Sequence, residues 1–474
     1  MTSFQVKNFT KPIFICFIFF LSINLSASIK MNYYDEELNY RLDKLKLCNI
    51  DVNLNSNHSS FFSPIINAIN SMPYEKLSRQ CQMNIDETLF LIKNKLSGFH
   101  NKLAFSSKKQ DLFFQDVSKR SYDEGLLYYS FENTFDNFAY KVSLNRINGK
   151  NQNNFSLDES YITFLNKNTV FSLGKVSRWW GSSVNTSLIL SNSARPSAGL
   201  SISSLNSIKI PFLSNVNYEI FINKLENNRF TPRPYLFGAR VKIDPIKNLS
   251  ISLYRTAQIG GEGRPLNFKV FTDMLLGIDN YKAGDNKEEP GNQLAGIDLK
   301  YDIPSINEFS LYGQIVGEDE SGYLPSRTFY MIGMEFKPKR PFNEKLNIEV
   351  FDTGSKIPNY TYSHFIYKSG YSYKNSPIGA SIGSDSKAVF LNYSRDISNK
   401  IQLNSRFIYG DINYNKNKLF KIDKYLQDLK VFELSLKRQS FFIDGLSSSL
   451  IFHFNDNDDE YENFGASINL EYIW

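Results

Sequence analysis

The sequence predicts an all-β transmembrane protein: an antiparallel β-barrel of about 18 strands, preceded by a small amino-terminal α-helical bundle. Three observations predict this fold. The chain begins like an exported protein, many short segments alternate between apolar and polar residues, and the last of these segments ends in an aromatic residue.

The amino terminus has the features of a secretory signal. Lys7 and Lys11 provide positive charge, and the apolar run PIFICFIFFLSINL follows them. This run is shorter than the roughly 20 apolar residues of a spanning helix. Small residues precede the expected cleavage position, so we predict a signal peptide over residues 1–28, cleaved after Ser28. An uncleaved membrane anchor is the alternative.

The composition narrows the class of protein. The 54 Lys and Arg residues nearly balance the 48 Asp and Glu residues, so we expect no nucleic-acid partner. Beyond the signal, no stretch approaches the roughly 18 apolar residues that a spanning helix needs, which argues against a helical membrane protein. Aromatic residues make up 15% of the chain. Such an exported chain is either a soluble β-rich protein or a transmembrane β-barrel.

The last segment favours the barrel. In GASINLEYIW, apolar and polar residues occupy opposite parities, as expected of a half-buried strand. The apolar residues of this segment are Ala466, Ile468, Leu470, Tyr472 and Trp474. Outer-membrane barrels resemble this pattern, because the barrel assembly machinery reads their last strand and its terminal aromatic residue. We therefore expect that machinery and outer-membrane lipid as partners, a location in the outer membrane of a Gram-negative bacterium, and a monomer.

The same alternation recurs along the chain. FAYKVSLNR, LFGARVKI and AGIDLKY alternate in this way, and clusters of Gly, Asn, Asp and Pro separate such segments. From about Leu126 to Trp474 there are roughly 18 to 20 of them, and tilted spanning strands need about 9–11 residues each. We predict that residues 106–474 form the barrel.

Charged residues fall on one parity of these segments. That parity should face the lumen, because lipid does not solvate charge. The predicted lumen residues are Lys141, Arg178, Glu219, Arg240, Lys242, Asp298, Lys300, Glu318, Glu335, Glu349, Arg406, Glu433, Lys437 and Glu471. Both signs occur, so pairing across the lumen is the simplest interpretation. The mixed lining argues against an ion-selective pore.

The region before the barrel, residues 29–105, has a different pattern. Leucines recur at helical spacing in YYDEELNYRLDKLKLCNI, and residues suited to helix ends follow. We predict three or four short helices between residues 35 and 98, docked against the mouth of the barrel. Cys48 and Cys81, the cysteines that remain after signal cleavage, lie here and in an oxidising compartment. They form either a disulfide, which we favour, or two buried thiols.

Signals for catalysis are weak. The four histidines are scattered and match no metal-ligand spacing, and neither Gly-x-Ser-x-Gly nor His-Glu-x-x-His occurs. Glu318 and Asp319 are adjacent, so on a strand they point to opposite faces and are poorly placed to act on one glycosidic bond. We expect no enzyme activity, no metal site and no cofactor.

Five motifs, in order, give the chain a resemblance to a known family. They are YRLDKLKLCNI, FSLGKVSRWWGSS with SLILSNSARP, LFGARVKIDP with ISLYRTAQIGGEGRP, NQLAGIDLKYDIP with FSLYGQIVGEDESGYLPSR, and YKSGYSYKNSPIGASIGSDS. In these motifs the chain resembles the Wzi-type capsule assembly proteins, which are outer-membrane barrels that hold capsular polysaccharide on the cell surface.

The resemblance implies a helical bundle on the periplasmic side of the barrel and lectin-like binding of a surface or capsular polysaccharide near the outer mouth. Proteins bind sugars with aromatic faces and with planar hydrogen-bonding groups, and the motifs supply both. The candidate polysaccharide-binding residues are Arg178, Trp179, Trp180, Arg195, Arg255, Arg264, Glu318 and Asp319.

Alternatives stay open for these residues and for the function. On a continuous strand Trp179 and Trp180 point to opposite faces, so an aromatic belt at the membrane surface competes with a ligand role. Arg178 must find carboxylates or sugar oxygens, and its expected protein partners are Glu318 and Asp319. A diffusion channel or transporter is the alternative to polysaccharide attachment, and an outer-membrane enzyme is a more remote one.

Overall fold

A computed structural model describes most of the chain. The described residues are 31–33, 38, 41–42, 44–45, 48, 59–96, 100–108, 125–135, 137–148, 154–276, 291–303, 309–318, 320–321, 324–325, 327–338, 344–355, 357–398, 400–420, 425–438, 445–456 and 463–474. The predicted signal peptide, residues 1–28, lies outside the described residues, and so does Asp319.

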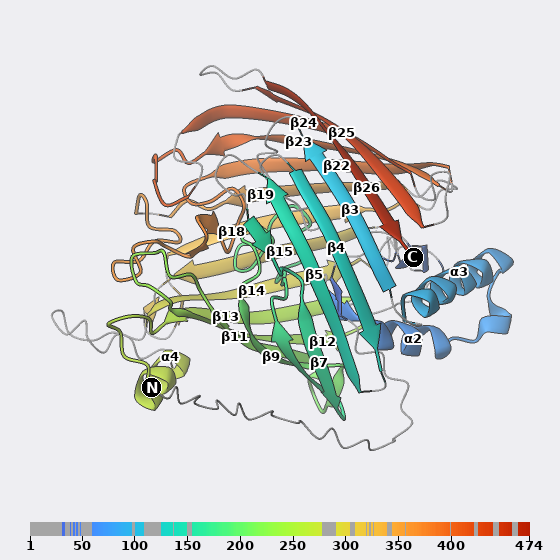
Figure 1. Ribbon diagram of the computed structural model, residues 1–474, viewed down its shortest axis with the longest axis horizontal. Helices are drawn as coiled ribbons and strands as arrows, with labels where there is room; N and C mark the ends of the chain where they lie inside the picture. Colours follow the sequence, from blue (N-terminus) through green and yellow to red (C-terminus); the bar gives the residue numbers. More distant parts are fainter. Residues whose placement is uncertain are drawn as a thin grey trace, which may run out of the picture.

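A closed antiparallel barrel forms the body of the protein (Figure 1). In the described part of the chain its wall has 18 strands, which confirms the predicted number. They are β3 (His100–Lys108), β4 (Gly125–Thr134), β5 (Phe138–Asn148), β7 (Tyr161–Asn166), β8 (Thr169–Gly174), β9 (Ala198–Ser204), β11 (Ser214–Lys224), β12 (Tyr235–Ile246), β13 (Leu249–Ile259), β14 (Asn292–Asp302), β15 (Phe309–Glu318), β18 (Thr328–Phe336), β19 (Glu344–Asp352), β22 (Lys387–Ser398), β23 (Ile401–Ile412), β24 (Leu426–Arg438), β25 (Leu446–Asp456) and β26 (Asn463–Ile473).

Short strands complete the sheet pairing. Strand β6 (Asn154–Ser156) pairs with β5, and β10 (Ile208–Ile210) pairs with β11. Strand β9 also pairs with β11, and β26 pairs with β3, so the wall strands form a closed ring. Two small ladders lie in the loops, and they join β16 (Glu320–Ser321) to β17 (Leu324–Pro325) and β20 (Ser372–Tyr373) to β21 (Ser376–Pro377).

The barrel begins earlier than predicted, at His100 rather than at residue 106. Strand β3 pairs with the last strand, β26, so the two ends of the wall meet there. Leu103 and Phe105 of β3 point outward and are 42% and 46% exposed. The segment carries few apolar residues and directly follows the helical region, so its strand pattern is weak in the sequence.

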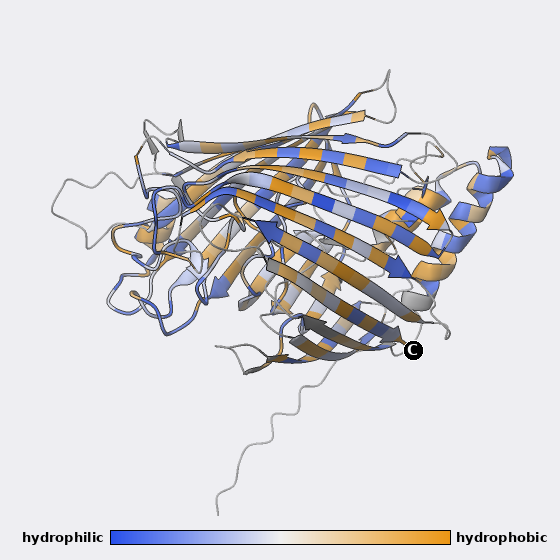
Figure 2. Cartoon of the chain, turned by 90° about the horizontal axis from the view of Figure 1, so that it is seen from above, coloured by the Kyte–Doolittle hydropathy of each residue, from blue (hydrophilic) through white to orange (hydrophobic). Residues whose placement is uncertain are grey.

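Each wall strand turns its side chains alternately outward and inward, which Figure 2 shows as alternating bands of hydropathy. Strand β18 is the clearest case, because Tyr330, Ile332 and Met334 are exposed while the residues between them are buried. Exposed apolar side chains therefore form the outer surface of the wall. A barrel that spans a bilayer needs such a surface.

Many of the charged residues predicted to face the lumen are buried there. This set comprises Arg178, Glu219, Arg240, Lys242, Asp298, Glu318, Glu335, Glu349, Arg406 and Glu433. Opposite charges pair between strands. Arg406 Nη2 lies 2.7 Å from Glu433 Oε1, and Lys345 Nζ lies 2.8 Å from Glu335 Oε2. The expected pairing of mixed lumen charges is confirmed for these residues.

The two ends of the barrel differ. At the turn end, tight turns link strands such as β7 with β8 and β12 with β13, where Lys167 and Asn248 have φ angles of 56° and 78°. At the loop end, long connections join β8 to β9, β13 to β14 and β19 to β22. Outer-membrane barrels have short turns in the periplasm and longer loops outside the cell.

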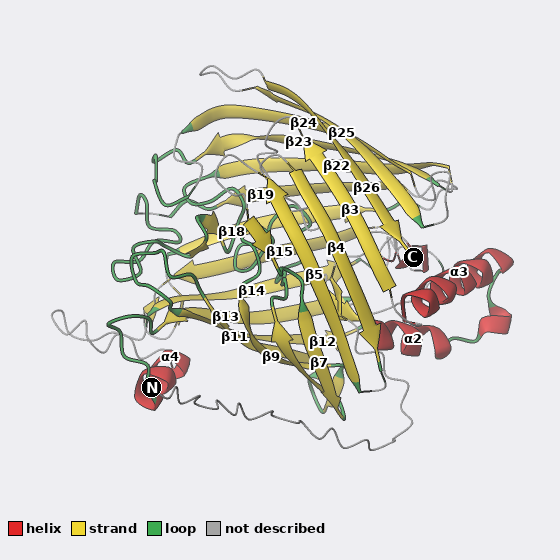
Figure 3. Cartoon of the chain, in the orientation of Figure 1, coloured by secondary structure: helices red, strands yellow, loops and turns green. Residues whose placement is uncertain are grey.

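A helix packs against the outer wall near the loop end. This helix, α4 (Phe268–Leu276), lies apart from the other helices (Figure 3). Phe271 contacts Phe237 edge-on, with ring centroids 5.5 Å apart, and Met274 joins Ala257 in the same buried cluster. The helix is not among the predicted elements. Its apolar residues have helical spacing, but the segment is short and follows a loop rich in glycine.

The amino-terminal segment lies at the turn end (Figure 1). Its elements are β1 (Met31–Tyr33), β2 (Ser59–Phe61), α2 (Phe62–Asn70), the 3-10 helix η1 (Tyr74–Lys76) and α3 (Arg79–Leu96). Its buried core comprises Leu38, Leu42, Leu45, Phe62, Ile65, Ile69, Ile85 and Ile92. The helices are as expected, whereas the ladder between β1 and β2 is not among the predicted elements. Asn67 Nδ2 donates to Asn206 Oδ1 of the barrel at 3.3 Å, so the segment docks on the barrel.

Cys48 and Cys81 form a disulfide, and their Cα atoms lie 5.7 Å apart. This is the alternative that we favoured from the sequence.

In the described residues, no helix combines the length and the apolar character needed to cross a membrane.

Removal of the disulfide should loosen the helical segment and leave the barrel intact. Cys48→Ser combined with Cys81→Ser should cost the segment about 3–4 kcal/mol of stability, because its unfolded chain is no longer cross-linked. Limited proteolysis should then cleave residues 59–96 at a much lower protease concentration. Heat-modifiable migration of the barrel on a gel is the control and should not change. Peptide mapping that finds two free thiols in the exported wild type would contradict the bridge.

Loss of the Trp474 ring should impair barrel assembly. Trp474 exchanges two backbone hydrogen bonds of 3.1 Å with Asn101 and stacks on Tyr472 at 5.1 Å. Trp474→Ala should lower the amount of heat-modifiable barrel in the membrane several-fold, because this strand closes the wall. Phe464→Ala removes another exposed ring from β26 and should have little effect. Equal yields of the two variants would show that the ring of Trp474 has no special role.

Candidate functional site

Two loops fold back into the barrel and fill much of it. The first plug loop, residues 175–197, links β8 to β9, and the second plug loop, residues 353–386, links β19 to β22. They bond to each other, because the Ser191 N–H donates to Ile378 O at 2.9 Å. Apolar side chains of both loops form one buried cluster with inward side chains of the wall.

Carboxylates of the wall hold the first plug loop in place. Asp298 on β14 accepts from the N–H of Ser182 at 2.9 Å and from its Oγ at 2.6 Å. Glu349 on β19 accepts from the N–H groups of Val184 at 2.8 Å and Asn185 at 3.1 Å. An irregular loop inside a barrel has no neighbouring strand to accept from its N–H groups, and these charged acceptors take that role.

An amide side chain provides a third anchor for the loop. Gln314 Nε2 on β15 donates to Trp180 O at 2.8 Å, and Gln314 Oε1 accepts from the Leu188 N–H at 2.8 Å. Side chains of β14, β15 and β19 therefore fix the path of the first plug loop.

Both tryptophans of the RWWG motif are buried inside the barrel. Trp179 Nε1 donates to Ser183 O at 3.0 Å, within the loop. Trp180 Nε1 donates to Glu219 Oε2 at 3.0 Å, and its ring stacks on Tyr254 with centroids 5.7 Å apart. The aromatic-belt alternative is wrong for both, because β8 ends before them and the strand parity does not continue through the loop.

Arg178 has a different partner from the predicted one. Its Nε donates to Glu219 Oε1 at 2.7 Å, and both side chains are almost fully buried. The predicted pairing with Glu318 is wrong, because Glu318 accepts instead from the backbone N–H of Tyr362 in the second plug loop. The other predicted partner, Asp319, lies outside the described residues. Arg178 thus belongs to the packing of the first plug loop against β11.

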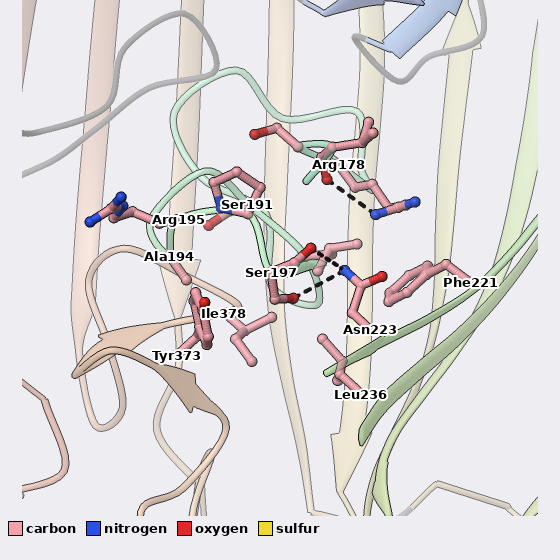
Figure 4. Close-up of a pocket in the computed structure, with 14 residues that line it drawn as sticks. Arg178, Ser191, Ala194, Arg195, Ser197, Phe221, Asn223, Leu236, Tyr373 and Ile378 are labelled. Carbon is pink, nitrogen blue, oxygen red and sulfur yellow. Dashed lines mark hydrogen bonds between the residues drawn. The ribbon is translucent and has the colours of Figure 1, made fainter. Parts of the chain in front are cut away.

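A pocket opens between the first plug loop, strands β11 and β12, and the hairpin of β20 and β21 (Figure 4). Its lining includes Arg178 and Arg195, which Figure 4 shows on opposite sides, together with Phe221, Asn223 and Tyr373. The pocket therefore combines guanidinium groups, an amide, a hydroxyl and aromatic rings. This set of groups suits a ligand with many hydroxyls.

Positive charge gathers at one edge of the pocket. Arg195 Nε donates to Asp158 Oδ2 at 2.6 Å, and Lys175 Nζ lies 3.6 Å from Asp158 Oδ1. Burial, and after it the charges of Arg195 and Lys175, lowers the pKa of the adjacent Lys374. Burial also raises the pKa of Tyr373 to about 12, so its hydroxyl stays protonated. The three cations outnumber the carboxylates of Asp158 and Glu226 beside them, which would favour an anionic group at this edge.

Among the described candidates only Arg178 and Arg195 line the pocket, and the others lie elsewhere, namely Trp179, Trp180, Glu318, Arg255 and Arg264. Arg255 faces outward on β13, beside the inward Tyr254, and its Nη2 donates to Gln293 Oε1 at 2.6 Å. Arg264 lies in the connection from β13 to α4, where its N–H donates to Gly261 O at 3.2 Å. Neither residue is in the described lining of the pocket. The alternation in SLYRTAQI already separates Arg255 from Tyr254, so its outward position is readable from the sequence.

Several residues at or beside the pocket are absent from the sequence-predicted set, among them Asn223, Tyr373 and Asp158. For Asn223 a signal exists, because it shares the inward parity of Glu219 on β11. Tyr373 and Asp158 lie among irregular loops, where periodicity does not give the direction of a side chain.

The fold and the pocket define a class of protein. It is a membrane-type β-barrel whose lumen is filled by its own loops and which has a polar and aromatic pocket lined partly by those loops. The family model named capsule assembly protein Wzi matches residues 100–443, so the chain belongs to this family.

Two relatives illustrate the match. The chain is 30% identical over 331 residues to an uncharacterized 55.8 kDa protein in the cps region of Klebsiella pneumoniae, covering 68% of this chain and 65% of that protein. It thus spans slightly less than two thirds of that relative. A solved structure of Wzi, described as a carbohydrate-binding outer-membrane β-barrel involved in group 1 capsule assembly in Escherichia coli, superposes with a TM-score of 0.79 at 22% identity, covering 93% of this chain and 98% of that one. This likeness confirms the fold.

Loss of a wall carboxylate should open the barrel to ions. Glu349→Ala leaves the N–H groups of Val184 and Asn185 without their acceptor, at a cost of about 1–3 kcal/mol each. We expect the first plug loop to detach, so that conductance in a planar lipid bilayer rises well above that of the wild type. Asn469→Ala, which removes a lumen side chain bonded to Ser449, is the control and should not change the current. Equal conductance in all three proteins would show that Glu349 does not hold the plug.

Proposed function

We propose that the protein lies in the outer membrane and attaches capsular or related surface polysaccharide to the cell surface. The observation that supports this most is the pocket, in which Arg195, Asn223 and Tyr373 converge beside a filled lumen. Membership of the capsule assembly family supports the same function. The description of the related Wzi structure as a carbohydrate-binding barrel agrees with it.

Each lining residue has a suitable task in binding a sugar. Asp158 accepts the Nε–H of Arg195 and orients the guanidinium, whose Nη groups then serve a sugar hydroxyl or carboxylate. Among the described residues, none donates to the buried Oδ1 of Asn223, and a sugar hydroxyl is a suitable donor. The ring of Tyr373 can pack against the C–H face of a sugar, whereas the Arg178 guanidinium lies over the ring of Phe221, 4.4 Å from its centroid.

A diffusion channel is the alternative function. The buried cluster that both plug loops form with the wall is evidence against it, because this cluster occupies the path that a solute would take. An enzyme is not proposed, since the pocket is explained by binding alone.

We also propose the partners that the barrel itself implies. Its exposed apolar wall would contact outer-membrane lipid, and the barrel assembly machinery would recognise β26. We expect a monomer. In the described chain each wall strand pairs with a neighbour on both sides, so the wall has no open edge strand that could pair with a second copy.

The polysaccharide remaining at the cell surface tests this function. In a deletion strain carrying Arg195→Gln, surface polysaccharide should fall about tenfold, which corresponds to the loss of roughly 1.4 kcal/mol of charge-assisted bonding. Arg264→Gln, an arginine outside the pocket, is the matched control and should restore the wild-type level. After Arg195→Gln the buried Asp158 still has Lys175 Nζ at 3.6 Å. Arg178 is a poorer choice, because its removal takes away the guanidinium bonded to the buried Glu219 and should cost about 3–5 kcal/mol of stability.

Heat-modifiability must first confirm equal amounts of folded barrel in the membrane. Wild-type retention by Arg195→Gln at an equal barrel level would remove the pocket from the proposed function. A deletion strain that keeps all its surface polysaccharide would reject the function itself.

A further inference from the structure

Two exposed aromatic side chains lie in loops at the loop end and not on the lipid-facing wall. Phe230 lies in the connection between β11 and β12, and Phe365 lies in the second plug loop. They are 62% and 57% exposed. Both sit in loops beyond the ends of the wall strands, so bilayer contact does not account for them.

Each ring is backed on one side by a nitrogen-bearing side chain. Lys368 Nζ lies 4.6 Å from the ring centroid of Phe230. The imidazole of His364 stacks on Phe365 with centroids 4.7 Å apart, and His364 is itself held because its Nδ1 accepts from the N–H of Ile366 at 3.2 Å. The rings are therefore fixed in place while much of their surface stays open to solvent.

The loops that present these rings are tied together. Arg229 donates through Nη1 to Ser372 O at 2.9 Å and through Nη2 to Gly370 O at 3.0 Å. The Phe230 N–H donates to Ser369 Oγ at 2.9 Å. Two loops that are far apart in the sequence thus form one rigid surface, which we call the mouth platform and define by Phe230, His364, Phe365 and Lys368.

The mouth platform is continuous with the pocket. Ser372, which Arg229 contacts, is followed directly by Tyr373, and Tyr373 lines the pocket. Both residues belong to β20, so this strand contacts Arg229, the neighbour of Phe230, through Ser372 and lines the pocket with Tyr373. A chain-like ligand that leaves the pocket on this side would meet the platform.

We propose that the mouth platform is a second binding site for an anionic polysaccharide, which would contact the platform with one sugar unit while another unit occupies the pocket. This inference rests on the proposed function and adds to it a second site and a charge class. A sugar ring has an apolar C–H face with hydroxyls at its rim, which matches isolated aromatic rings surrounded by polar groups. The ammonium of Lys368 beside Phe230 suits a sugar carboxylate.

Two linked contacts explain why a polymer would bind better than a fragment. When one unit is held in the pocket, the platform meets the next units at a high effective concentration. Short fragments reach only one site and gain nothing from this linkage. The length dependence of binding is therefore the property that distinguishes a two-site surface from a single pocket.

The test uses the full-length protein in lipid nanodiscs. The probes are surface polysaccharide purified from the parent strain and short oligosaccharides from its partial hydrolysis, measured by calorimetry. Phe230→Ala combined with Phe365→Ala should weaken polymer binding by roughly tenfold or more and leave fragment binding unchanged. Phe155→Ala, which removes a ring that is 82% exposed elsewhere on the barrel, is the matched control and should bind like the wild type.

Lys368→Met tests the charge class. It should weaken polymer binding at low salt and have little effect at high salt, where the ammonium is screened. Unchanged affinity at both salt concentrations would overturn the assignment of an anionic sugar to the platform.

The remaining outcomes separate this inference from the proposed function. If the double variant binds polymer like the wild type while Arg195→Gln does not, the platform is not a sugar site and the pocket stands. If the wild type binds neither probe, the proposed function fails and this inference fails with it. If the double variant keeps polymer binding but loses affinity for vesicles containing lipopolysaccharide, the rings serve a lipid surface instead.

Discussion

The folded arrangement inside the barrel depends on hydrogen bonds that wall carboxylates accept from the N–H groups of a loop. Asp298 and Glu349 are fully buried, and each accepts hydrogen bonds from the first plug loop rather than pairing only with a cation. Without such acceptors, an irregular loop in the lumen would bury unpaired backbone groups. The positions of Trp180, Arg178 and the pocket all follow from the path that these carboxylates impose.

This arrangement also explains why the lumen contains charges of both signs. Some pairs, such as Arg406 with Glu433, neutralise each other between neighbouring strands. Other acids have backbone N–H groups as partners and therefore need no cation of their own. A count of charges along the wall cannot distinguish these two uses, although both keep the interior closed.

The wall was the part of the fold most accessible to sequence reasoning. Strict alternation assigns side chains such as Ile332 and Glu335 to outside and inside, and lipid on one face enforces the choice. The pocket was much less accessible. Arg178 and Arg195, which the motifs single out, both line the pocket, but the pairing of Arg178 with Glu219 depends on how the chain leaves the wall after β8. No periodicity describes that path, and the same holds for the inward position of Trp179.

The three-point attachment of the first plug loop has a mechanical consequence. Asp298 and Gln314 lie opposite each other on the neighbouring strands β14 and β15, and Glu349 lies on β19, yet together they hold one short stretch of loop. Flowing liquid pulls on any long polymer attached to a cell, and a polymer seated beside Arg195 would pass that tension into this loop. Because the anchors lie on β14, β15 and β19, the load would spread over several strands of the wall and would not peel one strand from its neighbour.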